Sequence, residues 1–195
     1  MTALTLPLKV DLKHVHLTDE QFYQLCLSNP DLKIERTATG DLVFMSPVGG
    51  DSGNREMNLG GELYLWNKQT GLGKVFSSST IFKLPKGGNR SPDVAWVELS
   101  RWQSLTSEQR RQFPPIAPDF VIELRSYTDD LSTLQDKMQE YMDSGVQLGW
   151  LFNPQDQQVE IYRQGQTKEV RSLPTQLTGE TVLPEFVLQV DQFSD

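Results

Sequence analysis

Two short apolar segments of the chain each contain a carboxylate, and these two acids are the residues whose type and spacing could do chemistry. The first segment, Ser91–Val97, has Asp93 directly after a proline, and the second, Pro118–Ser126, has Glu123 among phenylalanine, valine, isoleucine and leucine. A charged group inside a buried strand is costly unless a metal ion, an ion pair or hydrogen bonds compensate it. We therefore expect Asp93 and Glu123 to belong to a site.

Carboxylates on neighbouring strands are hard oxygen ligands suited to Mg²⁺ or Mn²⁺, which activate water and neutralise a phosphate oxygen. The order Asp93, Glu123 and then the basic Arg125 two positions later is the layout of a divalent-metal phosphodiesterase centre. The plainer alternative is that Asp93 bonds to a turn and Glu123 pairs with Arg125. Either residue alone favours that alternative, because single motif matches are frequently accidental, but together they favour a metal site.

The elements that must position these residues follow from hydrophobic periodicity and from capping and turn residues. Helices are predicted over residues 18–27, 55–69 and 131–143, and strands over 32–35, 42–45, 75–79, 81–84, 93–97, 120–124, 149–152 and 158–162. Residues 49–54 are predicted as a flexible segment, 102–112 as a short surface helix with a loop, and 183–190 as a loop with a short edge element. This order predicts a mixed α/β (α+β) fold, a central sheet flanked by helices.

The helix over 131–143 connects the strand of Glu123 to the strand over 149–152. A strand, helix and strand in this order form a crossover unit whose two strands lie parallel. The sequence therefore predicts one parallel strand pair, with the helix packed on the face of the sheet beside it.

Length and charge limit the class of protein. A chain of 195 residues suits one domain over 1–195, and a net charge of −8 argues against non-specific coating of nucleic acid without excluding a nuclease. Cys26 is the only cysteine, so an intrachain disulfide and a cysteine-based zinc site are excluded. No apolar run is long enough to cross a bilayer, so we expect no membrane association and a cytoplasmic location.

Four segments together resemble the PD-(D/E)XK nuclease superfamily: Pro92-Asp93, Glu123–Arg125, Leu134–Tyr141 and Gly149–Pro154. More narrowly, they resemble a family of restriction-endonuclease-like bacterial proteins, catalogued as a domain of unknown function and expanded in cyanobacteria. The resemblance covers roughly residues 18–162, and the tandem of motifs is more specific than any one of them. It implies a restriction-endonuclease-like fold and a metal-dependent endonuclease acting on DNA, with Asp93 and Glu123 as ligands of Mg²⁺ or Mn²⁺.

One position departs from the superfamily pattern, because Arg125 stands where a lysine is usual. Arginine stays protonated and differs in reach, so the exchange is not conservative. The superfamily is known for lysines that migrate to a neighbouring helix, and Lys137 lies at the edge of the apolar arc of the helix over 131–143, where it could point back at the sheet. Gln135 borders the opposite edge as possible polar support. Their alternatives, a snorkelling lysine and a rim glutamine, carry equal weight.

Members of the superfamily often add a glutamate from a helix that precedes the core sheet. Glu56 lies within the apolar arc of its predicted helix and so faces the sheet, whereas Glu62 is less well aligned. We therefore expect Glu56 as a third metal ligand. The alternative is a helix-start glutamate favoured by the helix dipole.

The expected activity is hydrolysis of DNA phosphodiester bonds, with Asp93, Glu123 and Glu56 on the metal and Arg125 or Lys137 stabilising the transition state. A small domain with one shallow cleft cuts both strands of a duplex most easily as a symmetric pair, which predicts a homodimer. The rival hypothesis is a catalytically degenerate nuclease-fold module that binds nucleic acid or a protein partner. Arg125 and the negative net charge favour that rival.

Overall fold

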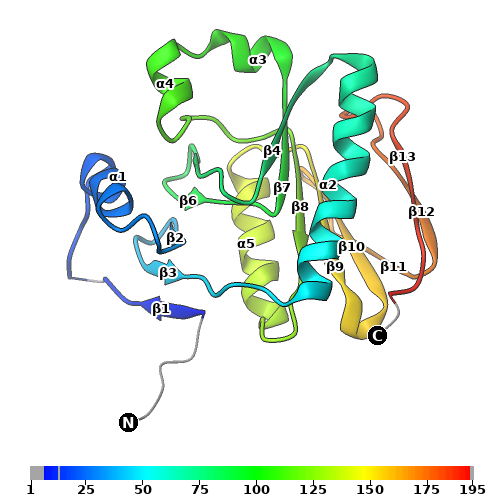
Figure 1. Ribbon diagram of the computed structural model, residues 1–195, viewed down its shortest axis with the longest axis horizontal. Helices are drawn as coiled ribbons and strands as arrows, with labels where there is room; N and C mark the ends of the chain where they lie inside the picture. The colour runs from blue at the N-terminus through cyan, green and yellow to red at the C-terminus, as the bar shows by residue number, and fades with distance from the viewer. Residues whose placement is uncertain (1–6, 13, 194–195) are drawn as a thin grey trace.

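The computed structural model describes residues 7–12 and 14–193. A six-stranded mixed sheet in the order β11-β10-β9-β8-β7-β4 forms its centre, with helices on both faces (Figure 1). Its strands are β4 Gly73–Ser77, β7 Val94–Glu98, β8 Phe120–Leu124, β9 Leu148–Asn153, β10 Gln158–Arg163 and β11 Glu169–Ser172. The predicted mixed sheet flanked by helices is confirmed.

The helices are α1 Asp19–Ser28, α2 Gly50–Thr70, α3 Leu99–Ser104, α4 Ser107–Arg111 and α5 Leu131–Asp143, with a 3-10 turn at Pro154–Asp156. Asp130 caps α5 by accepting from the N–H groups of Ser132 and Thr133, so α5 has the bounds that the sequence predicts. None of the described helices combines the length and the apolar composition needed to cross a membrane.

Helix α2 differs from its prediction at the N-terminal end. Residues 50–54, predicted as flexible, are helical, and the N–H of Gly53 donates to the carbonyl of Gly49 at 3.0 Å. Asp51 in the first turn favours this early start, because a carboxylate there complements the helix dipole. The C-terminal end agrees with the prediction, since Gly71 ends the helix in the left-handed conformation at φ 67°.

Side chains on β8 alternate between the two faces of the sheet. Phe120, Ile122 and Leu124 pack in the core cluster that contains the apolar face of α2, whereas Val121 packs in the cluster of α5. Glu123 shares the face of Val121, so α5 covers it. Gly149 allows this close packing, because a Cβ there would lie 2.5 Å from Cε of Met138.

Strand pairing brings the two acids together. β8 and β9 are parallel, as the crossover prediction requires, and β7 and β8 are antiparallel with Val94 opposite Ile122. Asp93 immediately precedes β7, and its Oδ2 accepts the backbone N–H of Leu124 at 2.7 Å, which places Asp93 beside the end of β8 that carries Glu123. The two acids line one pocket together with Leu134 of α5.

A second sheet lies beside α5 in the order β1-β3-β2-β6-β5 (Figure 1). Its strands are β1 Leu8–Val10, β2 Ile34–Arg36, β3 Leu42–Phe44, β5 Phe82–Lys83 and β6 Asn89–Arg90. The pairing of β2 with β3 confirms the predicted hairpin. This sheet supplies the buried charged residues Glu35 and Arg90, which contact α5.

The C-terminal segment contributes more than the predicted edge element. It forms β12 Thr175–Thr178 and β13 Val187–Val190, a two-stranded sheet beside α2 (Figure 1). Leu177, Phe186 and Leu188 are buried in the α2 cluster. The prediction missed this role because short strands with few apolar residues give weak periodicity.

Candidate active site

Asp93 and Glu123 line one pocket of about 210 Å³. The backbone N–H of Leu124 donates to Oδ2 of Asp93 at 2.7 Å. Oε1 of Glu123 accepts from the ammonium of Lys137 and from the hydroxyl of Tyr141. Ser144 Oγ is the one fully buried side-chain polar atom without a hydrogen-bond partner among the described residues. The second oxygens of Asp93 and Glu123, for which no protein partner is present, therefore reach solvent in the pocket. They are available to a ligand.

Lys137 binds Glu123 from α5. Its Nζ lies 2.8 Å from Oε1 of Glu123, and the hydroxyl of Tyr141 donates to the same oxygen at 2.9 Å. All three side chains are buried. The alternative in which Glu123 pairs with Arg125 is wrong for this structure, because Lys137 takes that place and does point back at the sheet.

A second buried carboxylate, Glu35 on β2, holds Lys137 from the other side. Oε1 of Glu35 lies 2.9 Å from Nζ of Lys137 and accepts the N–H of Ser91 at 3.0 Å, while Oε2 lies 3.0 Å from Arg90. Arg90 continues the network to Glu140 at 2.6 Å. Carboxylates and cations thus alternate from Glu140 to Glu123.

The two carboxylates that share Lys137 have different proton affinities. Burial alone would raise the pKa of Glu35, but the charges of Lys137 and Arg90 overcome it and lower the pKa to about 2. Glu123 is equally buried and has one cation, and the nearby Glu35 charge opposes its ionisation, so its pKa is raised. Glu35 is therefore a fixed anion, whereas the charge of Glu123 is incompletely compensated.

Asp93 is the least compensated acid of the site. Burial and then the charge of Glu123 raise its pKa to about 8, and Lys137 opposes this effect only in part. A carboxyl group with such a pKa holds a proton at neutral pH unless a cation replaces that proton. The carboxylates at positions 35, 93, 123 and 140, when ionised, outnumber the two cations Lys137 and Arg90 by two charges.

This arrangement fits a divalent cation. Asp93 and Glu123 present open oxygens to one pocket, and Glu56 lines the same pocket. Within the described residues no three His, Cys, Asp or Glu side chains are gathered closely enough to form a complete cage. Two protein carboxylates with water and substrate oxygens are the usual donor set of Mg²⁺, which keeps several waters.

Comparison with protein families identifies the family of the chain. The model of the Uma2 family, described as "putative restriction endonuclease", matches residues 19–191, nearly the whole chain. The chain belongs to the Uma2 family. That membership confirms the resemblance on which the sequence motifs converge and supports nuclease-type function in general.

One solved structure similar to this Uma2 chain is described as a putative nuclease belonging to DUF820 from Anabaena variabilis ATCC 29413. The two share 20% sequence identity and a TM-score of 0.69, over 80% of this chain and 87% of that one. At this identity the similarity establishes a common fold. No curated protein matches the chain.

Two of the predicted site residues lie away from the acidic pair. Nε of Arg125 donates to the carbonyl of Asp129 at 3.1 Å and Nη1 to Oδ1 of Asn153 at 3.2 Å, so the guanidinium is turned toward the end of β9. Nε2 of Gln135 donates to Glu160 at 2.7 Å on β10. Neither residue lines the Asp93–Glu123 pocket.

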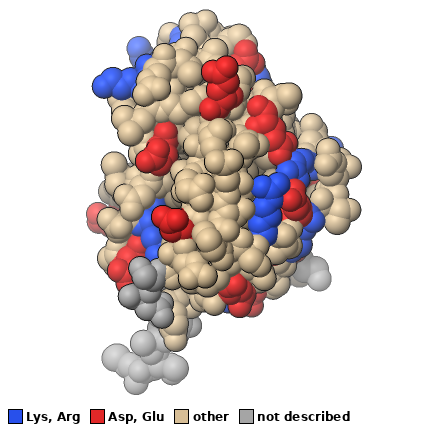
Figure 2. Space-filling view, turned by 90° about the vertical axis from the view of Figure 1, so that its right-hand side faces the viewer, with Lys and Arg blue, Asp and Glu red and all other residues tan. Residues whose placement is uncertain are grey.

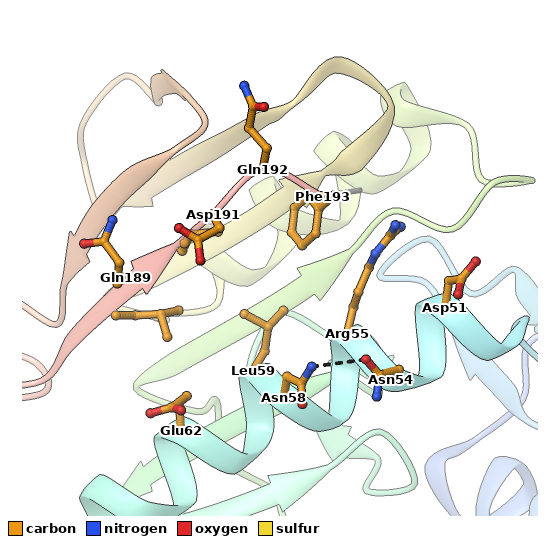
Figure 3. Close-up of a pocket in the computed structure, with 12 residues that line it drawn as sticks. Asp51, Asn54, Arg55, Asn58, Leu59, Glu62, Gln189, Asp191, Gln192 and Phe193 are labelled. Atoms are coloured by element: carbon orange, nitrogen blue, oxygen red, sulfur yellow. Dashed lines mark hydrogen bonds between the residues drawn. The ribbon is translucent and has the colours of Figure 1, made fainter. Parts of the chain in front are cut away.

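Helix α2 places its two glutamates in separate pockets. Glu56 is half-buried and lines the pocket of Asp93 and Glu123, whereas Glu62 lines a different pocket of about 510 Å³ between α2 and β13 (Figure 3). The preference for Glu56 over Glu62 as a neighbour of the acidic pair thus agrees with the structure. Its binding of metal stays a prediction.

Sequence reasoning missed Glu35 and Arg90. Glu35 lies between Ile34 and Arg36 in a strand of three residues, so the apolar run that singled out Glu123 is missing around it.

The structure nevertheless buries all three residues of this strand. The partner of Glu35 on α5, Lys137, is about a hundred residues away in the chain, and no local pattern connects the two.

Proposed function

We propose that this Uma2 protein is a metal-dependent endonuclease that hydrolyses phosphodiester bonds of DNA. The observation that carries the proposal is the pair Asp93 and Glu123, which lie at the adjoining ends of β7 and β8, each with an oxygen open to one pocket. Nζ of Lys137 lies 2.8 Å from Oε1 of Glu123, so two acids and one basic residue meet at this site. The resemblance to the PD-(D/E)XK superfamily implies such a group.

Asp93 and Glu123 would hold Mg²⁺ or Mn²⁺, with Glu56 as a further donor. The bound ion would supply a polarised phosphoryl oxygen and a water of lowered pKa. The residues of the chain prepare this site: the N–H of Leu124 fixes Asp93, and the hydroxyl of Tyr141 and the ammonium of Lys137 fix Glu123. Pre-set carboxylates need no reorganisation during the reaction.

Lys137 contributes its positive charge and its ion pair with Glu123. An ammonium has three N–H donors, and Glu123, Glu35 and the carbonyl of Ser91 at 3.2 Å occupy them all. Contact with a water or a phosphate would require exchange of one of these partners. Lys137 therefore acts mainly by stabilising negative charge that develops in the pocket and by positioning Glu123.

Cleavage of a supercoiled plasmid tests the proposal. The parent chain is incubated with Mg²⁺, with Mn²⁺ and with a chelator, and Asp93→Asn and Glu123→Gln serve as matched variants. Nicked or linear product with metal, its absence with chelator, and loss of at least about 100-fold in rate in both variants are expected. Equal product from Asp93→Asn would show that a contaminant or another site cleaves the plasmid.

The second candidate function is a catalytically degenerate nuclease-fold module that binds nucleic acid or a protein. It is favoured by the full occupation of the Lys137 donors and by the position of Arg125 outside the pocket. Calorimetric titration with Mn²⁺ separates the two, because a degenerate site should not bind the ion. The homodimer stays a prediction, and sedimentation equilibrium that shows monomer alone at high protein concentration would contradict it.

A further inference from the structure

A larger depression of about 760 Å³ lies directly beside the Asp93–Glu123 pocket. We call it the flanking groove. The two depressions share five lining residues, Ser46, Pro47, Val48, Ser52 and Ser126. A polymer whose phosphodiester bond lies over the acidic pair must place its neighbouring units in an adjoining depression. The flanking groove therefore has the position of a subsite for the nucleotide next to the cleaved bond.

Two arginines line the flanking groove. Arg125 uses Nε and Nη1 to hold Asp129 and Asn153, and its Nη2 makes no hydrogen bond or ion pair with the described residues. A guanidinium has five N–H donors in a planar fork that suits phosphate oxygens. Arg55 rises from α2 beside Phe193, with its guanidinium carbon 5.1 Å from the ring centroid (Figure 3). The groove thus has two arginines and one carboxylate, Asp51, in its lining, next to an acidic pocket.

Tyr127 also lines the flanking groove and is 92% exposed, more than any other large hydrophobic residue described. Its turn is ordered, because the N–H of Ser126 donates to Oδ2 of Asp129 at 2.8 Å and Gln155 donates to the carbonyl of Ser126 at 2.9 Å. This turn follows immediately after the strand of Glu123. An aromatic ring that a fixed turn exposes to solvent adds little to the stability of the isolated chain. Such a ring has the properties of a contact residue for a ligand.

We propose that the flanking groove binds one unpaired nucleotide of single-stranded DNA beside the scissile bond, with the base stacked on Tyr127 and a phosphate on Arg125. The inference rests on the proposed nuclease function and specifies its substrate class. Aromatic rings stack on single-stranded bases without sequence preference, since every base has a π-face.

Two observations favour an unpaired strand over a duplex. The face of a base can stack on a side chain only after it leaves its neighbours in the helix, which a single strand allows at low cost. Duplex binding by phosphate contacts instead needs many clustered Lys and Arg residues. The chain has a net charge of −8, and on the face shown in Figure 2 acidic and basic side chains are interspersed.

Fluorescence anisotropy with a labelled single-stranded oligodeoxynucleotide and the matching duplex tests the proposal. Binding is measured in an Asp93→Asn background, which blocks cleavage under the proposed function. Tyr127→Ala, Tyr127→Trp and Tyr64→Ala are compared in this background. Tyr64 is the matched control, because it is 55% exposed on α2 and lines neither depression.

The single strand is expected to bind more tightly than the duplex. Tyr127→Ala should weaken that binding by roughly 5- to 100-fold, whereas Tyr127→Trp and Tyr64→Ala should leave it nearly unchanged. Equal affinity of Tyr127→Ala and its background, tighter binding of the duplex, or no binding of the single strand would each overturn the proposal. If Tyr127→Ala weakens binding but the parent chain cleaves no DNA with Mg²⁺ or Mn²⁺, the nucleotide subsite stands and the nuclease function fails.

Discussion

Nζ of Lys137 lies 2.8 Å from Oε1 of Glu123, so the cation beside Glu123 comes from α5, the helix after β8. Arg125, two positions after Glu123, does not supply it, because its guanidinium binds Asn153. The contact is buried, and Glu35 holds the same ammonium at 2.9 Å. A buried cation between two carboxylates couples the stability of the fold to the charge of the site, because each partner loses its compensation when another is removed.

Lys137→Met is expected to abolish cleavage and to destabilise the chain. Its loss leaves two buried carboxylates without their shared cation, which costs about 3–5 kcal/mol of unfolding free energy. Urea denaturation measures that loss, and plasmid cleavage at matched concentrations of folded protein measures the rate.

The double variant Glu35→Gln with Lys137→Met separates the two effects. It removes one negative and one positive charge together, so part of the stability should return while cleavage stays at least about 100-fold below the parent rate. A double variant as active as the parent chain would mean that Lys137 has no part in the reaction.

Asp93 predicts a pH dependence of stability in metal-free buffer. Its pKa is raised by burial and by Glu123 from 3.8 to about 8, so the folded state keeps a proton that the unfolded state releases. Unfolding free energy should therefore fall as pH rises from 3.8 to about 8, by at most about 1.4 kcal/mol per pH unit from this group. Asp93→Asn should reduce this slope, and Mn²⁺ should stabilise the parent chain more than the variant. Parallel pH profiles for the two chains would show that Asp93 is ionised without metal.

The central elements follow from the sequence because their signals are local. Helix α5 has a capping aspartate, Asp130, and an apolar arc, and the strands of Glu123 and Trp150 are rich in apolar residues, so their approximate bounds and their parallel pairing could be predicted. The placement of Lys137 at the edge of the arc also follows from helical geometry. Its salt bridge to Glu123 shows that this edge faces the sheet.

The remaining features depend on contacts between distant segments. Glu35 meets Lys137 only after the β2–β3 hairpin packs beside α5, and β12 and β13 enter the core only after α2 is in place. Arg125 lies two positions after Glu123, but β8 ends at Leu124, so the alternation that predicts a shared face no longer applies to it. Its contacts with Asn153 and Asp129 decide its direction instead.

Glu56→Gln is expected to weaken Mn²⁺ binding by about 10-fold, because residues that support a metal from the edge of its site typically contribute on this scale. Glu62→Gln, the same substitution two turns later on α2, lines the other pocket and should leave the affinity unchanged. Calorimetric titration of both variants checks this. Equal affinities in the two variants would assign Glu56 to the helix rather than to the metal.

Arg125→Lys would restore the residue type usual in the superfamily, and the sequence alone predicts preserved or raised activity. The structure changes that expectation: the guanidinium anchors the turn before α5 and does not line the acidic pocket, so the lysine should not raise the cleavage rate. Mn²⁺ affinity should stay the same in Arg125→Lys, since no contact to Asp93 or Glu123 is lost. A higher rate in this variant would mean that the side chain turns into the pocket during the reaction.

Glu35→Gln removes the carboxylate that holds Lys137 on the side away from Glu123, and it is expected to lower both stability and activity. The pKa of Glu35 is lowered from 4.5 to about 2, because Lys137 and Arg90 overcome the effect of burial, so its charge stabilises the fold above pH 4.5 and this contribution is lost as pH falls toward about 2. Acid titration of unfolding free energy should show this loss in the parent chain and a flatter profile in Glu35→Gln.

The same variant tests whether Glu35 positions Lys137 for the reaction. Release of one partner lets the ammonium move, so cleavage should fall in kcat with little change in KM, whereas a purely structural role would lower only the amount of folded enzyme. Glu140→Gln is the matched control, because it also removes a carboxylate from Arg90 but does not contact Lys137. Equal kcat values for the parent chain and Glu35→Gln at matched folded concentration would limit Glu35 to the stability of the fold.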